Sequence, residues 1–147
     1  MFYGQYTIHI KDEQAISLPD RFANDLHSNL FITQGFDRNL IIMPENEFLS
    51  FYHHIRAMNI ANPLARLFLR HFLANAAFVS HGDIEHIEIS DRLYEYADLS
   101  KEDAVVLVGQ GDHLEVWQQK TWQEQSLDIQ DSSKNAHRFA GLYLRVG

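Results

Sequence analysis

The residue types best suited to chemistry lie in the stretch SHGDIEH, at residues 80–86. His81, Asp83 and His86 offer two imidazoles and a carboxylate, which are ligand types that bind Zn²⁺. Alternation along a strand would place His81 and Asp83 on the same side. The other histidines show no ligand spacing that would complete the coordination. We therefore predict neither a bound metal nor a cofactor, and a metal-binding module stays a weaker alternative.

The same stretch contains Ser80, His81 and Asp83, the residue types of a hydrolase triad. Adjacent side chains on an extended strand point to opposite faces, whereas the members of a triad must converge along a line of hydrogen bonds. The sequence also contains no nucleophile elbow and no phosphate-binding glycine loop. We therefore predict that the protein is not an enzyme.

Two polar turns form another candidate site. The sequence KDEQA at 11–15 leads into the apolar run ISLP, and GDIEH at 82–86 leads into IEIS. Surfaces that contact DNA present lysine and arginine to phosphates and base edges. Lys11 in the first turn and His86 in the second are each outnumbered by acidic neighbours. The charge of both turns therefore opposes binding to a duplex.

The overall composition argues against a protein that is basic over its whole surface. The 147 residues include 20 acidic and 12 basic side chains, which gives a formal net charge of -8, so any nucleic-acid contact must come from a local patch. The absence of cysteine excludes disulfides and thiolate chemistry. No signal peptide and no apolar run near the roughly 18 residues of a membrane span is visible. We expect a soluble, untargeted protein without a membrane partner.

The periodicity of apolar residues predicts an α+β fold built from a repeated unit of strand, strand, helix, hairpin and helix. The first copy is expected to have strands at 6–10 and 16–18, a helix from 20 with Phe22, Ala23 and Leu26 on one face, a hairpin at 30–43 and a helix from 45 with Phe48 and Ile55 inward. A helix that begins at 61–63 and includes LARLFLRHFLANA follows, with Leu64, Leu67 and Phe72 at helical spacing. The second copy is expected to have strands at 76–80 and 86–90, a helix from 91, a hairpin at 104–117 and a helix from 118.

Residue identities support the repeat. The stretch ISLPDRF at 16–22 matches IEISDRL at 87–93, with Ile, Asp and Arg identical at an offset of 71. Phe48 and Trp122 occupy equivalent positions farther along, at an offset of 74. Open solenoids typically need three or more repeats, so two copies favour a pair related by a pseudo-two-fold axis around one core.

We divide the chain into four parts on this basis. They are a first module at 1–60, a central helix at 61–76 that joins the modules, a second module at 77–125, and a C-terminal tail at 126–147 outside both copies. Apolar residues of the tail could dock it as a last helix or on a neighbouring subunit: Phe139, Leu142, Tyr143 and Leu144.

Several stretches, taken in order, resemble the MraZ family of bacterial transcriptional regulators. They are MFYGQYTIHI, ISLP, LFITQGFDRNLIIMP, ARLFLRHFLANA and VVLVGQGDHLEVWQQKTW, which together span about residues 1–125. The resemblance implies two SpoVT/AbrB-like β-modules with flanking helices, related by a pseudo-two-fold axis. It also implies ring-shaped homo-oligomers that bind direct repeats in the promoter DNA of division and cell-wall genes.

The two turns depart from the family pattern. MraZ-like sequences carry Asp-x-x-Gly-Arg before the proline-terminated strand in both modules, and the arginine faces DNA. The corresponding positions hold Lys11, Gln14 and Ala15 in the first module, and Gly82, Glu85 and His86 in the second. Loss of these arginines should weaken DNA binding and flatten its salt dependence.

Four residues remain candidates for DNA contact: Lys11, Arg21, His86 and Arg92. Arg21 and Arg92 occupy equivalent positions at the start of the module helices. The alternative is that both arginines pair with nearby carboxylates on exposed helix faces, namely those of Asp20, Asp25, Asp91 or Glu95.

Arg66 and Arg70 lie four residues apart on the central helix, and both belong to the resemblance. A polar stripe of this kind is typical of an amphipathic helix. We favour a structural role or a role in a subunit interface over direct DNA contact.

The resemblance therefore predicts a cytoplasmic, nucleoid-associated transcriptional regulator. Its expected partners are double-stranded DNA, further copies of itself, and a MraZ paralogue in mixed rings. The rival prediction is a diverged structural or interaction protein of the same fold that has lost autonomous DNA binding.

Overall fold

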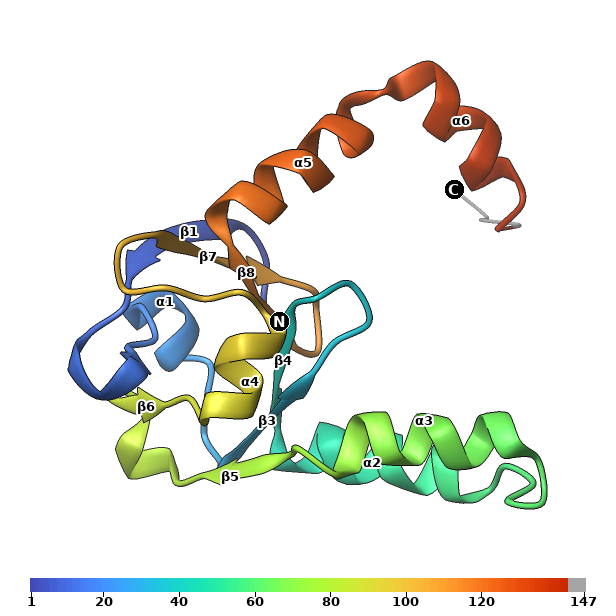
Figure 1. Ribbon diagram of the computed structural model, residues 1–147, viewed down its shortest axis with the longest axis horizontal. Helices are drawn as coiled ribbons and strands as arrows, with labels where there is room; N and C mark the ends of the chain where they lie inside the picture. Colours follow the sequence, from blue (N-terminus) through green and yellow to red (C-terminus); the bar gives the residue numbers. More distant parts are fainter. Residues whose placement is uncertain (143–147) are drawn as a thin grey trace.

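The computed structural model describes residues 1–142 and has an α+β architecture (Figure 1). The first copy of the repeat contains β1 (Gln5–His9), β2 (Ala15–Ile16), α1 (Asp20–Ala23), β3 (Leu30–Gln34), β4 (Leu40–Pro44) and α2 (Glu45–Arg56). After α3 (Pro63–Leu73), the second copy contains β5 (Ala77–Val79), β6 (Ile87–Glu88), α4 (Asp91–Tyr96), β7 (Ala104–Gly109), β8 (Leu114–Gln118) and α5 (Gln119–Gln130), and α6 (Ser132–Ala140) follows. This order confirms the predicted repeat.

The two copies exchange strands within one six-stranded sheet. Its order is β1-β7-β8-β4-β3-β5, so the first strand of each copy pairs with the hairpin of the other. Tyr6 of β1 lies opposite Leu107, and Phe78 of β5 lies opposite Phe31, both in antiparallel register. The order reads the same when the two copies are interchanged, as the predicted pseudo-two-fold axis requires.

Each copy contributes one hairpin, and the hairpin strands β4 and β8 meet at the centre of the sheet. The buried side chain of Asn39 holds the turn of the first hairpin, because its Oδ1 accepts from the backbone amide of Asp37 at 3.1 Å. Its Nδ2 donates to Oε2 of Glu115 on β8 at 2.9 Å. The turn of one copy is thus tied to a strand of the other.

The main core lies on one face of the sheet, under α1 and α4. Phe22 of α1 and Leu93 of α4 are almost completely buried there, together with alternate residues of the strands. Alternation places successive side chains on opposite faces of a strand, which explains why every second residue of the hairpins joins this cluster. Leu26 is also buried, although α1 is shorter than predicted and ends at Ala23.

The helices α2 and α3 lie side by side (Figure 1) and form a second cluster on the other face of the sheet. Phe48 of α2 stacks on Phe31 of β3 with ring centroids 4.0 Å apart, and Phe72 of α3 lies 5.1 Å from Phe48. The predicted apolar face of α3 packs against this cluster from Phe68 onward. Leu64 and Leu67 stay exposed, because the first turns of α3 extend beyond the sheet (Figure 1).

The helix α5 crosses the boundary that we expected at residue 125. Trp122 packs on Trp117 with ring centroids 5.4 Å apart, and its Nε1 donates to Oε1 of Gln5 at 2.9 Å. Beyond this contact, α5 and α6 project away from the sheet (Figure 1). Since α6 follows α5 as α3 follows α2, we extend the pattern of the second copy to residue 140. The four-part division itself stays a prediction.

The exposed C-terminal helices leave the predicted docking of the tail untested. Phe139 and Leu142 are exposed in the single chain, and Tyr143 and Leu144 lie outside the described residues. Within residues 1–142, no helix combines the length and the apolar character that crossing a lipid bilayer requires.

Candidate nucleic-acid interface

The two polar turns lie side by side in the structure. Each contains a short 3₁₀ turn, η1 (Asp12–Gln14) before β2 and η2 (His81–Asp83) before β6. The strands β2 and β6 pair in antiparallel register, with Ala15 opposite Glu88 and Ile16 opposite Ile87. This two-stranded sheet therefore makes one surface out of two turns that are distant in sequence.

Gln14 fastens the first turn to the second copy. Its backbone carbonyl accepts from the amide of Ile89 at 3.0 Å, and its Nε2 donates to the carbonyl of Ile89 and to Oδ1 of Asp91, both at 3.0 Å. Gln14 has a φ of 55°, a left-handed conformation that glycine adopts without strain. Glycine is the residue that the family pattern places here. Ala15, where the pattern has arginine, is completely buried and presents no side chain to a ligand.

The first turn offers one exposed cation and two carboxylates. The side chain of Lys11 is exposed, and its backbone amide donates to the carbonyl of Ala15 at 2.7 Å. Asp12 forms an ion pair with Lys101. The hydrogen bond from Lys101, together with its charge, lowers the pKa of the Asp12 carboxyl. This carboxylate is therefore ionised at neutral pH, and Lys101 compensates its charge locally.

His86 lies between two carboxylates from different parts of the surface. Its Nε2 is 3.2 Å from Oε2 of Glu13 on the first turn and 3.7 Å from Oε1 of Glu88 on β6. The hydrogen bond with His86, and after it the hydrogen bond with Glu88, lower the pKa of the Glu13 carboxyl. The imidazole is thus directed at protein carboxylates, which leaves it less suited to contact phosphate.

Arg21 rests on two tyrosines. Its guanidinium carbon lies 4.0 Å from the ring centroid of Tyr3, and its Nη1 donates to the hydroxyl of Tyr6 at 3.3 Å. The Tyr6 hydrogen bond raises the pKa of Arg21. Among residues 1–142, neither Arg21 nor Arg92 forms an ion pair with the carboxylates that we considered. Both side chains are exposed, and their contact with DNA stays a prediction.

The two arginines of the central helix differ in their surroundings. Nη1 of Arg66 donates to the carbonyls of Ile60 and Ala61 at 3.1 and 3.0 Å, and so closes the loop between α2 and α3. Arg70 is exposed near the C-terminal end of α3. The interface role that we favoured for this pair stays a prediction.

The residues from which we considered a metal site or a triad do not converge. Nε2 of His81 lies 2.9 Å from the carbonyl oxygen of Leu26, so the ring is directed at the first copy of the repeat. The groups that do come together within the described residues are those of Glu13, His86 and Glu88, whose ligand atoms lie within 4.8 Å of one another. The sequence matched the two copies to each other, but no pattern in it indicated that β2 and β6 pair.

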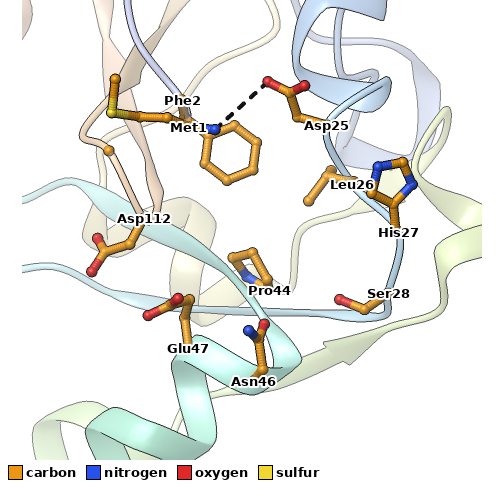
Figure 2. Close-up of a pocket in the computed structure, with 11 residues that line it drawn as sticks. Met1, Phe2, Asp25, Leu26, His27, Ser28, Pro44, Asn46, Glu47 and Asp112 are labelled. Atoms are coloured by element: carbon orange, nitrogen blue, oxygen red, sulfur yellow. Dashed lines mark ion pairs between the residues drawn. The ribbon is translucent and has the colours of Figure 1, made fainter.

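A further hollow of the described surface lies elsewhere, between the N-terminus and the start of α2. It has a volume of about 520 Å³. Figure 2 shows the ion pair between the Met1 amino group and Asp25, which are 3.9 Å apart, with Glu47 and Asp112 on another wall. Ser28 also lines the hollow, but its hydroxyl donates to the carbonyl of Asn29. The acidic walls make this hollow a poor match for DNA.

Comparison with known proteins matches the sequence of both copies of the repeat. Residues 86–141 match the family model described as "MraZ protein, putative antitoxin-like". The chain is 34% identical to a transcriptional regulator MraZ from Corynebacterium kroppenstedtii over 135 aligned residues. The aligned residues are 92% of this chain and 93% of the relative. The chain belongs to the MraZ family.

Other MraZ relatives extend over most of the same region. A transcriptional regulator MraZ from Carboxydothermus hydrogenoformans is 34% identical over 122 residues, which are 83% of this chain and 84% of the relative. One from Mycobacterium sp. (strain KMS) is 37% identical over 125 residues, 84% of this chain and 85% of the relative. These matches confirm the resemblance inferred from the sequence. The segment matched by the MraZ model also extends into α6, beyond the end that we expected near residue 125.

Proposed function

We propose that this protein is a MraZ-type transcriptional regulator that binds double-stranded DNA through the surface formed by its two turns. The pairing of β2 with β6 carries the proposal, because it presents both turns of the duplicated fold on one side of the molecule. The named relatives are transcriptional regulators, so we propose binding rather than catalysis. Lys11, Arg21 and Arg92 are the exposed cations that we assign to phosphate contact.

We further propose that the protein acts as a ring of identical subunits. The ring binds direct repeats in the promoter DNA of division and cell-wall genes, in the cytoplasm and on the nucleoid. Linked weak contacts gain affinity through effective concentration, which suits a surface with few free cations. Repeated head-to-tail contacts close into a ring when the rotation between subunits allows it. Multi-angle light scattering on the intact protein measures the number of subunits.

Exposed apolar residues on two separate parts of the chain support such a head-to-tail contact. The loop and first turns that lead into α3 expose Met58, Ile60, Leu64 and Leu67, beside an apolar groove of about 340 Å³. The helices α5 and α6 and the residues after them expose Leu127, Ile129, Phe139 and Leu142. Large exposed apolar patches mark interaction sites on soluble proteins.

The acidic character of the turns supports one alternative, a diverged MraZ protein that keeps the assembly and has lost autonomous DNA binding. Lys101 is engaged with Asp12, and His86 lies between Glu13 and Glu88. A mixed ring with a MraZ paralogue would then supply the missing DNA contacts.

Fluorescence anisotropy separates the two candidates. The intact protein is titrated against the DNA upstream of its own gene and against a scrambled duplex, at low and at moderate salt. We expect tighter binding to the upstream DNA, weakening as salt rises, because phosphate contacts release counterions. Equal affinity for both duplexes at both salt concentrations would contradict the regulator and favour the alternative.

A charge variant tests whether the turns face the DNA. Glu85 is exposed within the second turn, so Glu85→Lys should tighten binding and steepen the salt dependence by about one phosphate contact. Glu124→Lys on α5 is the matched control, because it changes the net charge equally on an exposed helix that projects from the sheet (Figure 1). Equal responses of the two variants would show that net charge, and not the turn surface, decides affinity.

A further inference from the structure

Three potential metal ligands meet at the junction of the two turns. Nε2 of His86 lies 3.2 Å from Oε2 of Glu13 and 3.7 Å from Oε1 of Glu88, and one ligand atom of each residue lies within 4.8 Å of the others. A Zn²⁺ ion binds nitrogen and oxygen ligands at about 2.0–2.2 Å in a tetrahedron, so two of its ligands are roughly 3.3 Å apart. The two imidazole-to-carboxylate distances bracket that spacing.

The backbone places these three side chains. Glu88 belongs to β6, which is held in register by its pairing with Ala15, and Gln14 bonds to Ile89 and Asp91 directly beyond it. The amide of His86 donates to the carbonyl of Asp83 at 3.0 Å, which closes the second turn. The positions of His86 and Glu88 thus depend on the strand pairing and on the turn hydrogen bond, and the side chain of Gln14 ties the first turn, which carries Glu13, to the second copy.

Solvent reaches the cluster from outside. The side chains of His86, Glu13 and Glu88 are 47%, 69% and 65% exposed, so shifts of a few tenths of an ångström are easily accommodated. His86 and Glu88 also line a surface hollow of about 460 Å³ together with Ser80 and Asp83. The open side leaves room for water or another ligand in the remaining coordination positions.

Charge favours a cation at this place. Glu13 and Glu88 place two carboxylates beside a single imidazole nitrogen, and this negative surrounding attracts a cation. The donor set of one nitrogen and two oxygens matches Zn²⁺ and similar transition metals, whereas Mg²⁺ and Ca²⁺ prefer oxygen ligands alone.

We propose that Glu13, His86 and Glu88 form a surface site for a divalent transition-metal ion of the Zn²⁺ class, which bridges the two copies of the repeat and neutralises their shared turn surface. The neutralising effect on DNA binding rests on the proposed function. The bound ion removes the repulsion between these carboxylates and phosphate, and so raises the affinity for DNA in the intact chain.

The site is tested first without DNA. Metal-free full-length protein is titrated with Zn²⁺ by calorimetry and with Co²⁺ by absorption spectroscopy, which reports tetrahedral coordination. We expect one ion per chain, and at least about a tenfold loss of affinity in each of His86→Asn, Glu13→Gln and Glu88→Gln. Circular dichroism verifies that the variants are folded, which we expect because all three side chains are exposed.

A second histidine and carboxylate pair provides the matched control. Nδ1 of His113 lies 2.7 Å from Oδ1 of Asp112, and among the described residues no third ligand joins this pair. His113→Asn should leave Zn²⁺ and Co²⁺ binding unchanged. Equal binding by His86→Asn and the wild-type protein, or a loss of the ion in His113→Asn alone, would overturn the site.

The effect on DNA is measured by anisotropy, with zinc or with a chelator, for the wild-type protein and His86→Asn. We expect zinc to tighten binding to the upstream duplex several-fold in the wild-type protein only. Equal responses would overturn the regulatory role, while DNA binding itself would still stand. If neither protein prefers the upstream duplex under any condition, the proposed function fails, and the Zn²⁺ titration still decides whether the site exists.

Discussion

At the scale of single residues, partners decide what a side chain is free to do. Sequence alone makes His86 and Arg21 similar candidates for phosphate contact. In the structure, His86 is directed at Glu13 and Glu88, whereas Arg21 lies over Tyr3 and bonds to Tyr6. The tyrosines leave the positive charge of the guanidinium uncompensated, whereas the ring nitrogen of His86 is already engaged with two carboxylates. Arg21 is therefore the better candidate of the two.

Asp128 shows how one carboxylate supports a local structure in a pH-dependent way. Its Oδ1 accepts from Nη1 of Arg138 at 3.0 Å and lies 3.4 Å from Nζ of Lys134. The Arg138 hydrogen bond lowers the pKa of Asp128 below its ordinary value of 3.8. The ionised carboxylate therefore stabilises the contact between α5 and α6 fully above the ordinary pKa of 3.8. This stabilisation is lost as the pH falls through the lowered pKa of Asp128 in the folded protein.

We predict that Asp128→Asn increases hydrogen exchange in α6 at pH 7. Protection factors for residues 132–140 should fall several-fold relative to the wild-type protein, because α6 loses the ion pairs of Lys134 and Arg138 with Asp128 of α5. The difference between the two proteins should disappear as the pH falls through the lowered pKa of Asp128, because the wild-type carboxylate is then also protonated. Glu124→Gln serves as the control, and a pH-independent difference in Asp128→Asn would contradict this account.

At the scale of elements, the short helices over the main core are stable because of the apolar side chains that they bury. The helix α1 has only four residues and α4 has six, which is far below the length at which isolated helices persist in water. Phe22 and Leu93 bury their side chains in the main core, so tertiary packing supports these helices. The helix α3 buries Ala65 and Phe72, yet Leu64 and Leu67 stay exposed where its first turns extend beyond the sheet.

We predict that Phe72→Ala lowers the free energy of unfolding by about 3–5 kcal/mol. Phe72 is completely buried, and its ring packs on Phe48 and Phe51 with centroids 5.1 and 4.7 Å away. Urea denaturation measures the change. Leu64→Ala on the exposed end of the same helix should change the free energy by no more than about 0.5 kcal/mol. Similar losses in both variants would contradict the packing described for α3.

At the scale of the whole molecule, strand exchange joins the two copies into one folding unit. The strand β1 pairs with β7 of the second copy, and β5 pairs with β3 of the first. Neither copy contains partners for all its own strands. The two modules that the sequence indicates are therefore copies of a repeat and are not independently folding domains. We expect a single cooperative transition when the protein unfolds.

We predict that a fragment of residues 1–76 does not form a stable monomer. It contains β1, β2 and the β3–β4 hairpin but lacks β5, β6, β7 and β8, so each of its four strands loses a pairing partner. Circular dichroism should show no cooperative thermal transition for this fragment, and addition of residues 77–147 should restore one. A folded monomer of 1–76 with a sharp transition would contradict strand exchange as the basis of stability.

The sequence by itself determined the repeated order of elements, both hairpins and the helix from residue 45, because these depend on local periodicity and on turn residues within short windows. It also determined that the family motif is missing from both turns. The register of β2 against β6 depends on contacts between residues far apart in the chain, and local patterns carry no information about it. Only the tertiary structure decided that Glu13, His86 and Glu88 meet, that Ala15 is buried, and that each copy lends its first strand to the other.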